Sequence, residues 1–405
     1  MKQKKRWLAA LLAVSLSITM ITPVSAGGIE GEVPEEAQET AAPADASALE
    51  IPAQSYILLE SKTGTVITEK DADVQMPPAS ITKIMTLLLV MEAVDSGKIS
   101  MEDTVTASEH ASSMGGSQIW LKEGEQMAFT DVLKAAVVAS ANDASVALAE
   151  HVAGSEESFV TMMNERAAQL GMTNTVFKNA TGLDADGHVS SARDISIMAR
   201  ELLKHPRILD YTTIWMDSLR GGETELVNTN KLIRFYEGAT GLKTGTTNGA
   251  GYCLCATAER NGETLIAVVM GSTTTADRFS AARKLLDYGF ANYTVFDPSS
   301  LELVMEPVPV RHGVVGEVEC EAGEMQPILL QKGQEKDITT RINLPEDVMA
   351  PVEEGQNLGT VEVLHGEEKI GEYPIRAKSA IEKMTFSHAF FKLLEQVSAM
   401  NVEKL

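Results

Sequence analysis

The sequence predicts an α+β fold for residues 51–297, followed by a small all-β domain at 298–378 and an amphipathic helix at 380–405. Strand-like runs lie at both ends of the first segment and helical runs lie between them. The second segment holds short alternating runs broken by Gly and Pro. With 405 residues and 44% hydrophobic content, the chain can bury the cores of two or three domains.

Residues 1–26 have the pattern of a secretory signal peptide. Four of the first six residues are basic, an apolar run follows, and Val24-Ser25-Ala26 provides a small-residue cleavage site. A retained membrane helix is the alternative, because the apolar run borders on spanning length. Residues 27–50 are rich in acids, Ala, Gly and Pro, which predicts a solvated acidic linker. We therefore expect an exported, extracytoplasmic protein.

The first domain begins with a predicted β-hairpin. The runs SYILLES and TVITEK flank Lys62-Thr63-Gly64, whose glycine suits a turn. The run ASITKIMTLLLVMEAVDSG is apolar on nearly every helical face, so we expect a helix inside the domain. Two further helices, TDVLKAAVVA and DASVALAEHVA, have Thr130 and either Asn142 or Asp143 as candidate N-caps.

The rest of this domain continues helical over 155–205, interrupted by the loop NATGLDADGHVSS. In this region we expect His188 to face solvent or pin the loop, and Asp194 to lie near a helix start. GYCLCATAE and TLIAVVMG then predict a hairpin, because Asn261-Gly262 supplies the positive φ angles of a type I′ turn. The helix DRFSAARKLLDYGF closes the segment.

Composition narrows the possible functions. The net charge of -23 argues against binding nucleic acid. The seven histidines show no paired-ligand spacing, so we expect no metal and no cofactor. Cys253, Cys255 and Cys320 are interpreted as small buried hydrophobic residues, because two residues at i and i+2 of a strand are poorly placed to bridge.

Two short motifs could provide a nucleophile and its partners. Ser80 and Lys83 are one helical turn apart, so the lysine can take the serine proton if burial near other cations lowers its pKa. A capping serine and a lysine reaching solvent is the alternative. Ser140 and Asn142 could relay a proton and hold a carbonyl, although by themselves they are more simply interpreted as a helix cap.

The tripeptide Lys-Thr-Gly occurs twice, at 62–64 and at 243–245. The first copy is predicted to be a hairpin turn. The second lies on a predicted strand and offers a cation, a hydroxyl and a close-approach glycine, which suit a carboxylate and an oxyanion. The order Ser-x-x-Lys, Ser-x-Asn, Lys-Thr-Gly makes coincidence a poor explanation, because β-lactamases and penicillin-binding proteins carry this set.

The surrounding sequence extends the match: PPASITKIMT, GGSQIWLKEGE, ASANDASVALAEHVAG, LGMTNTVFKNATGLDADGHVSSARD and LKTGTTNGAGYCLCATAERNG. With these segments the chain resembles the D-alanyl-D-alanine carboxypeptidases, the low-molecular-mass penicillin-binding proteins of serine peptidase family S11. The resemblance covers essentially the whole chain. It implies a β-lactamase/penicillin-binding-protein-like catalytic domain that removes the terminal D-alanine of peptidoglycan stem pentapeptides and is acylated by β-lactams.

The resemblance also implies roles for individual residues. Ser80 would be the acylated nucleophile and Lys83 the general base. Ser140 and Asn142 would serve proton relay and positioning, with Lys243 polarising the relay. The N–H groups of Ser80 and Thr246 would form the oxyanion hole, and Thr244 and Arg278 would bind the terminal carboxylate. The implied substrate-binding residues are Lys243, Thr244, Gly245, Thr246, Arg278 and Ser117.

Other functions are weighed against this one. A class A β-lactamase uses a loop glutamate, yet no acidic residue lies between Arg166 and Asp184, and the second motif is Ser-Ala-Asn. A D,D-endopeptidase acting on cross-linked peptidoglycan could have the same motifs. A non-catalytic cell-wall or β-lactam-binding module would have no need of the complete set.

The C-terminal residues Phe386, Phe390, Leu393, Leu394, Val397 and Met400 share one helical face. The family resemblance implies that this helix is a peripheral membrane anchor. Its basic residues are offset by acidic ones, so attraction to anionic lipid is small. A helix that packs on the β domain or on a partner is the alternative.

Overall fold

The structure is a computed structural model that describes residues 49–402, with side-chain surroundings up to residue 397. The predicted signal peptide and nearly all of the predicted linker lie outside the described residues. Leu49, at the end of that linker, is half-buried against the first domain. No helix within 49–402 has the length and apolar character needed to cross a membrane.

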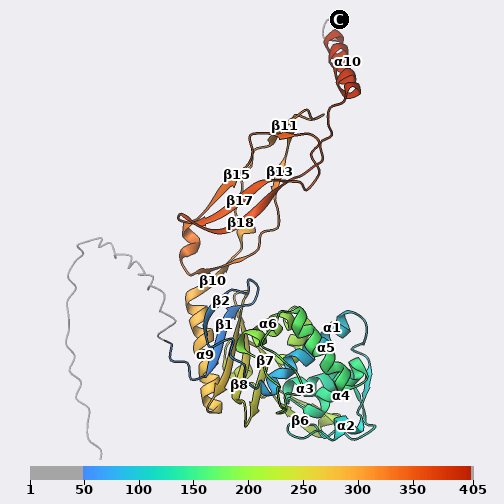
Figure 1. Cartoon of the computed structure of the whole chain (residues 1–405), viewed down its shortest axis with the longest axis vertical. Helices are drawn as coiled ribbons and strands as arrows, with labels where there is room; N and C mark the ends of the chain where they lie inside the picture. Colours follow the sequence, from blue (N-terminus) through green and yellow to red (C-terminus); the bar gives the residue numbers. More distant parts are fainter. Residues whose placement is uncertain (1–48, 403–405) are drawn as a thin grey trace, which may run out of the picture. The chain divides into compact units, whose positions relative to one another are not determined.

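The centre of the first domain is a five-stranded antiparallel sheet with the strand order β2-β1-β9-β8-β7 (Figure 1). Its strands are β1 (Ser55–Glu60), β2 (Val66–Lys70), β7 (Ala239–Thr247), β8 (Gly251–Arg260) and β9 (Glu263–Ser272). The sheet therefore combines strands from both ends of the domain, as predicted. Both predicted hairpins are confirmed, and Asn261 and Gly262 have φ values of 53° and 79° at the β8–β9 turn.

The sheet has an apolar layer on each face, because successive side chains of a strand point to opposite sides. Ile57 and Leu59 of β1 belong to the larger core, whereas Tyr56 and Leu58 belong to the smaller one. Helix α9 (Thr275–Asn292) packs on the second face, where Leu232 of the short helix α8 (Leu232–Phe235) also joins the apolar core, and the other helices of the domain lie on the first face (Figure 1).

The helices on the first face are α1 (Lys83–Asp95), α2 (Glu109–Ser112), α3 (Phe129–Val138), α4 (Asn142–Ala153), α5 (Glu156–Gln169), α6 (Ala192–Leu202) and α7 (Leu209–Thr212). Helix α1 is buried on nearly all sides, as its apolar sequence predicts. Two short antiparallel pairs of strands complete this layer: β3 (Thr104–Thr106) with β4 (Gln126–Ala128), and β5 (Met216–Leu219) with β6 (Thr224–Val227).

The second domain is all-β, as predicted. Its strands are β11 (Val308–Arg311), β12 (Glu317–Val318), β13 (Cys320–Ala322), β14 (Ile328–Gln331), β15 (Ile338–Asn343), β16 (Val348–Met349), β17 (Asn357–His365) and β18 (Glu368–Ala377). They enclose a separate apolar core around Val361 and Ile375. The connecting strand β10 (Tyr293–Phe296) follows α9 and pairs with β14.

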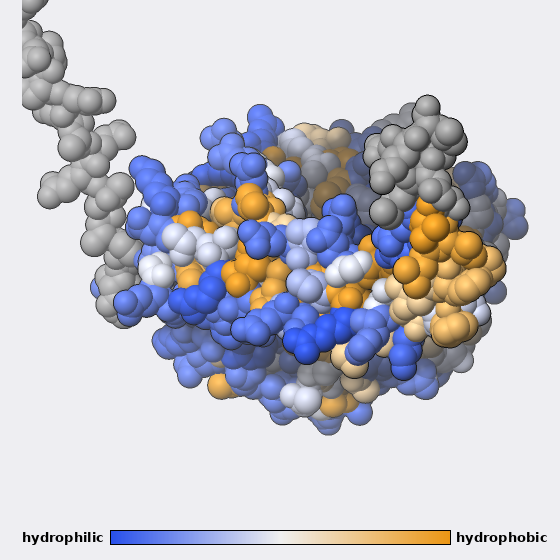
Figure 2. All heavy atoms as spheres, turned by 90° about the horizontal axis from the view of Figure 1, so that it is seen from above, coloured by the Kyte–Doolittle hydropathy of each residue, from blue (hydrophilic) through white to orange (hydrophobic). Residues whose placement is uncertain are grey.

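The chain ends in helix α10 (Phe386–Val402), which presents large apolar side chains to solvent. Phe386 is 87% exposed and Phe391 is 64% exposed. Phe390 lies between them and stacks on Phe386. Figure 2, which looks at the molecule from the end where α10 lies, shows hydrophobic residues gathered on the surface.

Candidate active site

The first motif begins a helix in the middle of the first domain. Ser80 lies on the 3-10 turn Ala79–Thr82, and Lys83 is the first residue of α1. Lys83 is completely buried, and its Nζ lies 3.2 Å from Ser80 Oγ. The interpretation of Lys83 as a lysine that reaches solvent is therefore wrong. Serine and lysine have instead the spacing of a nucleophile and its base.

Two further contacts fix the direction of the Lys83 amine. Its Nζ donates to Asn142 Oδ1 at 2.6 Å and to the Thr181 carbonyl at 2.8 Å. Asn142 Nδ2 donates to the Gly115 carbonyl at 2.7 Å, so the amide oxygen must face Lys83. A neutral amine has two protons and one lone pair. With both protons given to acceptors that cannot donate, the lone pair is left for the Ser80 hydroxyl.

The electrostatics of the site favour a neutral amine at Lys83. Burial holds the pKa of Lys83 well below its usual value, and the charge of Lys243 lowers it further. The carboxylate of Asp143 acts in the opposite direction. Lys243 is itself buried, which lowers its pKa to about 7, with a second contribution from Arg278. The charge of Arg278 thus lowers the pKa of Lys243, and the charge of Lys243 lowers that of Lys83.

The second motif lies in the break between α3 and α4. Ser140 is buried in a left-handed conformation with φ 60°, and its Oγ has no hydrogen-bond partner among residues 49–402. Its hydroxyl is therefore available to another group. The predicted N-caps are wrong: α3 and α4 follow Ala128 and Ala141 without a side-chain cap, because the amide of Asn142 is used by Lys83 instead.

The third motif lies on β7, beside the first. Lys243 and Thr244 are buried, and Thr244 Oγ1 donates to Thr229 Oγ1 at 2.7 Å. Gly245 is needed for close approach, because a Cβ there would lie 2.9 Å from the Pro78 carbonyl oxygen and 3.0 Å from Ala79 Cβ. The second Lys-Thr-Gly copy thus lies next to Ser80. The first copy is the β1–β2 turn, as predicted, where Lys62 Nζ donates to the Gly262 carbonyl.

Arg278, on α9, reaches through to the end of β7. It is 7% exposed, and its Nη1 donates to Thr246 Oγ1 at 2.9 Å and to the Gly245 carbonyl at 3.1 Å. The structure therefore brings Arg278 to the third motif. Ser117 enters through its backbone: its carbonyl accepts the Asn142 N–H at 2.6 Å, while the residue itself is exposed.

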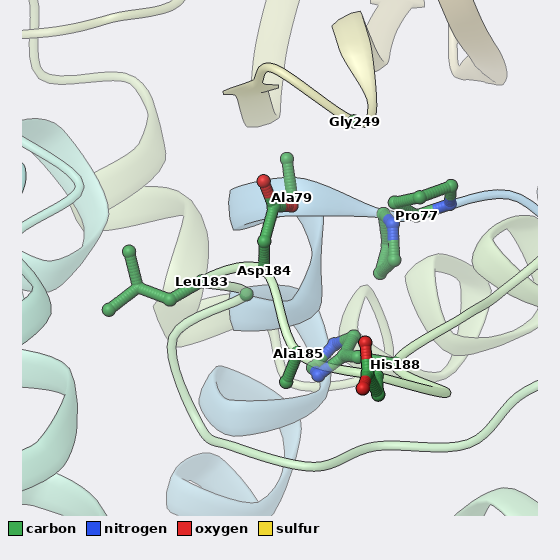
Figure 3. Close-up of a pocket in the computed structure, with 10 residues that line it drawn as sticks. Pro77, Ala79, Leu183, Asp184, Ala185, His188 and Gly249 are labelled. Atoms are coloured by element: carbon green, nitrogen blue, oxygen red, sulfur yellow. The ribbon is translucent and has the colours of Figure 1, made fainter.

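The loop 178–190 forms the opposite wall of the site. His188 is buried; its Nε2 lies 2.8 Å from Thr82 Oγ1, and its Nδ1 accepts the Lys178 N–H at 3.1 Å. It therefore pins the loop and does not face solvent. A pocket of about 340 Å³ lies where the loop meets Pro77 and Ala79, and Gly249 also lines it (Figure 3).

Two contributors were missed in the sequence. Thr181 acts through its backbone carbonyl, which leaves no side-chain signature. Asp143 is buried and accepts the N–H groups of Ile119 and Leu121, so it holds the loop before the second motif in place. Its position beside Asn142 was the available signal. Asp194 does lie in the first turn of α6. Its carboxylate, however, accepts hydrogen bonds from the Asn174 N–H and the Thr175 hydroxyl, and not from the N–H groups of the helix.

Comparison with known proteins defines the class to which this fold and site belong. The family model of the D-alanyl-D-alanine carboxypeptidases, peptidase family S11, matches residues 38–274. The model of the penicillin-binding protein 5 C-terminal domain matches residues 299–383. The chain therefore belongs to peptidase family S11 and is a serine-type D-alanyl-D-alanine carboxypeptidase, a hydrolase.

Individual relatives agree with this assignment. D-alanyl-D-alanine carboxypeptidase DacF of Bacillus subtilis (strain 168) is 44% identical over 82% of this chain and 87% of the relative. Penicillin-binding protein 5 of Haemophilus influenzae has a similar structure, with a TM-score of 0.75, 32% identity, and coverage of 83% of this chain and 99% of that one. Penicillin-binding protein D2 of Listeria monocytogenes, solved with bound ampicillin, has a TM-score of 0.55 and 33% identity over 60% of this chain and 99% of that one.

Proposed function

We propose that this carboxypeptidase removes the terminal D-alanine from peptidoglycan stem pentapeptides through an acyl-enzyme on Ser80. The observation that carries the proposal is the buried Lys83 amine, whose Nζ lies 3.2 Å from Ser80 Oγ and is held there by the amide oxygen of Asn142 and the carbonyl of Thr181. Such a group is a suitable base for a serine nucleophile in the absence of a histidine.

In the first half of the reaction, Ser80 Oγ attacks the carbonyl carbon of the penultimate D-alanine while its proton moves to Lys83. The N–H groups of Ser80 and Thr246 stabilise the oxyanion of the tetrahedral intermediate. The C–N bond then breaks, and the leaving amine takes a proton through Lys83 and the free hydroxyl of Ser140. D-alanine departs, and water hydrolyses the remaining ester with Lys83 again as the base.

The substrate carboxylate is bound by the cationic end of the site. Lys243 and Arg278 are both buried in a chain whose net charge is -23, so they concentrate positive charge where the rest of the surface is acidic. The hydroxyl groups of Thr244 and Thr246 lie beside them and would turn from Thr229 Oγ1 and the Gly245 carbonyl to donate to the carboxylate. A β-lactam offers a carboxylate and a strained amide in similar positions, so it acylates Ser80 and inhibits the enzyme.

The test is release of D-alanine from diacyl-Lys-D-Ala-D-Ala by the wild-type chain and by Ser80→Ala. We expect release by the wild type, none by the variant, and a covalent penicillin adduct on Ser80. Lys243→Ala should abolish release, whereas Lys62→Ala, the matched change in the other Lys-Thr-Gly copy, should not. Release only from cross-linked muropeptides would favour a D,D-endopeptidase. No turnover and no adduct would favour a binding module.

We place this activity outside the cytoplasm, in cell-wall biogenesis, with α10 as a peripheral membrane contact. The exposed apolar side chains of Phe386, Phe390 and Phe391 support this contact, because such a helix can lie in the lipid headgroup region. The full chain should sediment with phospholipid vesicles, and a chain ending at Lys378 should stay in solution. Equal sedimentation of the two chains would contradict the anchor. Because the helix has little net charge, zwitterionic vesicles should serve about as well as anionic ones.

A further inference from the structure

An exposed tryptophan stands beside the active site in an unfavourable backbone conformation. Trp120 is 68% exposed, and its ring has no aromatic or cation partner among the described residues. Its φ of 56° lies in the left-handed region, which bulky side chains avoid. Residues held in such conformations cluster at functional sites, where the surrounding structure imposes them.

The surrounding contacts fix this conformation on both sides of Trp120. The buried Asp143 carboxylate accepts the N–H of Ile119 and the N–H of Leu121, each at 3.0 Å, and both of those side chains are buried. Arg220 Nη1 donates to the Ile119 carbonyl at 2.9 Å. The buried residues Ile119 and Leu121 therefore fix the backbone on both sides of Trp120, so the indole is held in a defined position at the surface.

The ring borders a groove of about 640 Å³, within the size range of ligand sites. Lys122, Glu123, Glu223 and Thr224 also line it and supply hydrogen-bond donors and acceptors of both charges. Arg220 also lines the groove and, like Trp120, has a left-handed backbone conformation, with a φ of 53°. A flat apolar ring surrounded by such groups suits a sugar, whose ring has a C–H face and a rim of hydroxyl and amide groups.

One loop connects the residues that line the groove with the second catalytic motif. The carbonyls of Gly115 and Ser117 accept hydrogen bonds from Asn142, which also binds Lys83. Trp120 follows Ser117 by three residues, a span of at most about 10 Å of extended chain. A stem peptide whose fourth residue lies at Ser80 reaches about 13 Å to the amino sugar that carries it. The first span starts at Ser117, which Asn142 connects to Lys83, so a stem peptide that extends from Ser80 can carry its sugar toward the Trp120 loop.

We propose that the Trp120 groove binds the amino-sugar part of the substrate, with the indole stacked on a sugar ring. This inference rests on the proposed carboxypeptidase function and adds a preference for substrates still attached to sugar. It makes Trp120 a specificity-determining residue that acts on substrate binding and leaves the acylation chemistry unchanged.

The test compares kcat/KM for a disaccharide-pentapeptide with that for diacyl-Lys-D-Ala-D-Ala. Trp120→Ala should lower the first value about tenfold, by analogy with the stacking of a nucleic-acid base on an aromatic side chain, and leave the second unchanged. Trp120→Phe should retain part of the preference. Phe386→Ala, which removes an exposed aromatic ring from α10, is the matched control and should change neither value. A loss on both substrates, or on neither, would overturn the inference.

A second measurement separates this inference from the proposed function. Binding of the peptide-free disaccharide to Ser80→Ala protein requires the groove but no catalysis. We expect binding that Trp120→Ala, introduced into the same protein, weakens about tenfold. Absence of disaccharide binding would contradict the sugar site even if the wild type releases D-alanine. Disaccharide binding together with no D-alanine release by the wild type would support the sugar site and refute the proposed function.

Discussion

Gly182→Ala is expected to disable acylation by displacing the backbone next to the nucleophile. A Cβ at Gly182 would lie 1.8 Å from the Ala79 carbonyl oxygen, whereas ordinary contact begins at 3.4 Å. One backbone must therefore move by about 1.6 Å. Gly182 also has a φ of 83°, which costs an alanine about 1–2 kcal/mol. Because a displacement of about 1 Å can cost a reaction about 100-fold, acylation should slow by at least that factor.

The assay is the second-order rate constant of acylation by a fluorescent penicillin, measured with the urea midpoint of unfolding. Gly187→Ala is the matched control on the same loop. Gly187 has a similar φ of 74°, but its Cβ would lie 3.5 Å from Lys178 Cε, the flexible end of a side chain. The Gly187→Ala variant should lose about 1–2 kcal/mol of stability, because alanine is also unfavourable in this left-handed conformation. It should be acylated at the wild-type rate. Wild-type acylation by folded Gly182→Ala, or equal slowing in both variants, would refute the reasoning.

Two further predictions concern pH. The pKa of Lys243 is lowered to about 7 in the folded state, so the unfolded chain holds one more proton than the folded chain between about pH 7 and 10.5. The free energy of unfolding should therefore rise with pH over this interval. Lys243→Met should flatten that rise, measured by urea unfolding at about pH 7, 8 and 9. Burial lowers the pKa of His188 to about 4, so the free energy of unfolding should fall as the pH drops from 6.5 toward 4. The His188→Gln variant should lose less stability than the wild type over this interval. An equal loss in both proteins would exclude His188 as the cause.

Local signals were sufficient for the two hairpins of the sheet and for the buried helix after Ser80, whereas the first motif by itself left two interpretations open. Asn261-Gly262 defines its hairpin because the turn chemistry is contained in two residues. The spacing of Ser80 and Lys83 places both on one helical face, whatever surrounds them. The long apolar run after Ser80 predicts a buried helix for the same reason, since its pattern needs no knowledge of the neighbouring elements.

Contacts between distant segments could not be predicted in this way. Asn142 has the local features of a helix cap, yet its amide binds Lys83, 59 residues away in the sequence. Thr181 contributes a carbonyl, which every residue possesses, so only the path of the loop selects it. The strained φ of Trp120 likewise depends on Asp143 and Arg220, neither of which is its neighbour in sequence.

The position of β1 between β2 and β9 has a consequence for how the enzyme matures. Ser55 pairs with Met270, so the inner edge of β1 stays unsatisfied until nearly the whole first domain has been synthesised. Contacts this distant in sequence form slowly, because a long loop must close before they stabilise the chain. Ser80 and Lys83 emerge early and Lys243 late, so a partly synthesised chain carries the nucleophile and its base without the third motif. Penicillin reactivity should therefore report completed folding of the first domain.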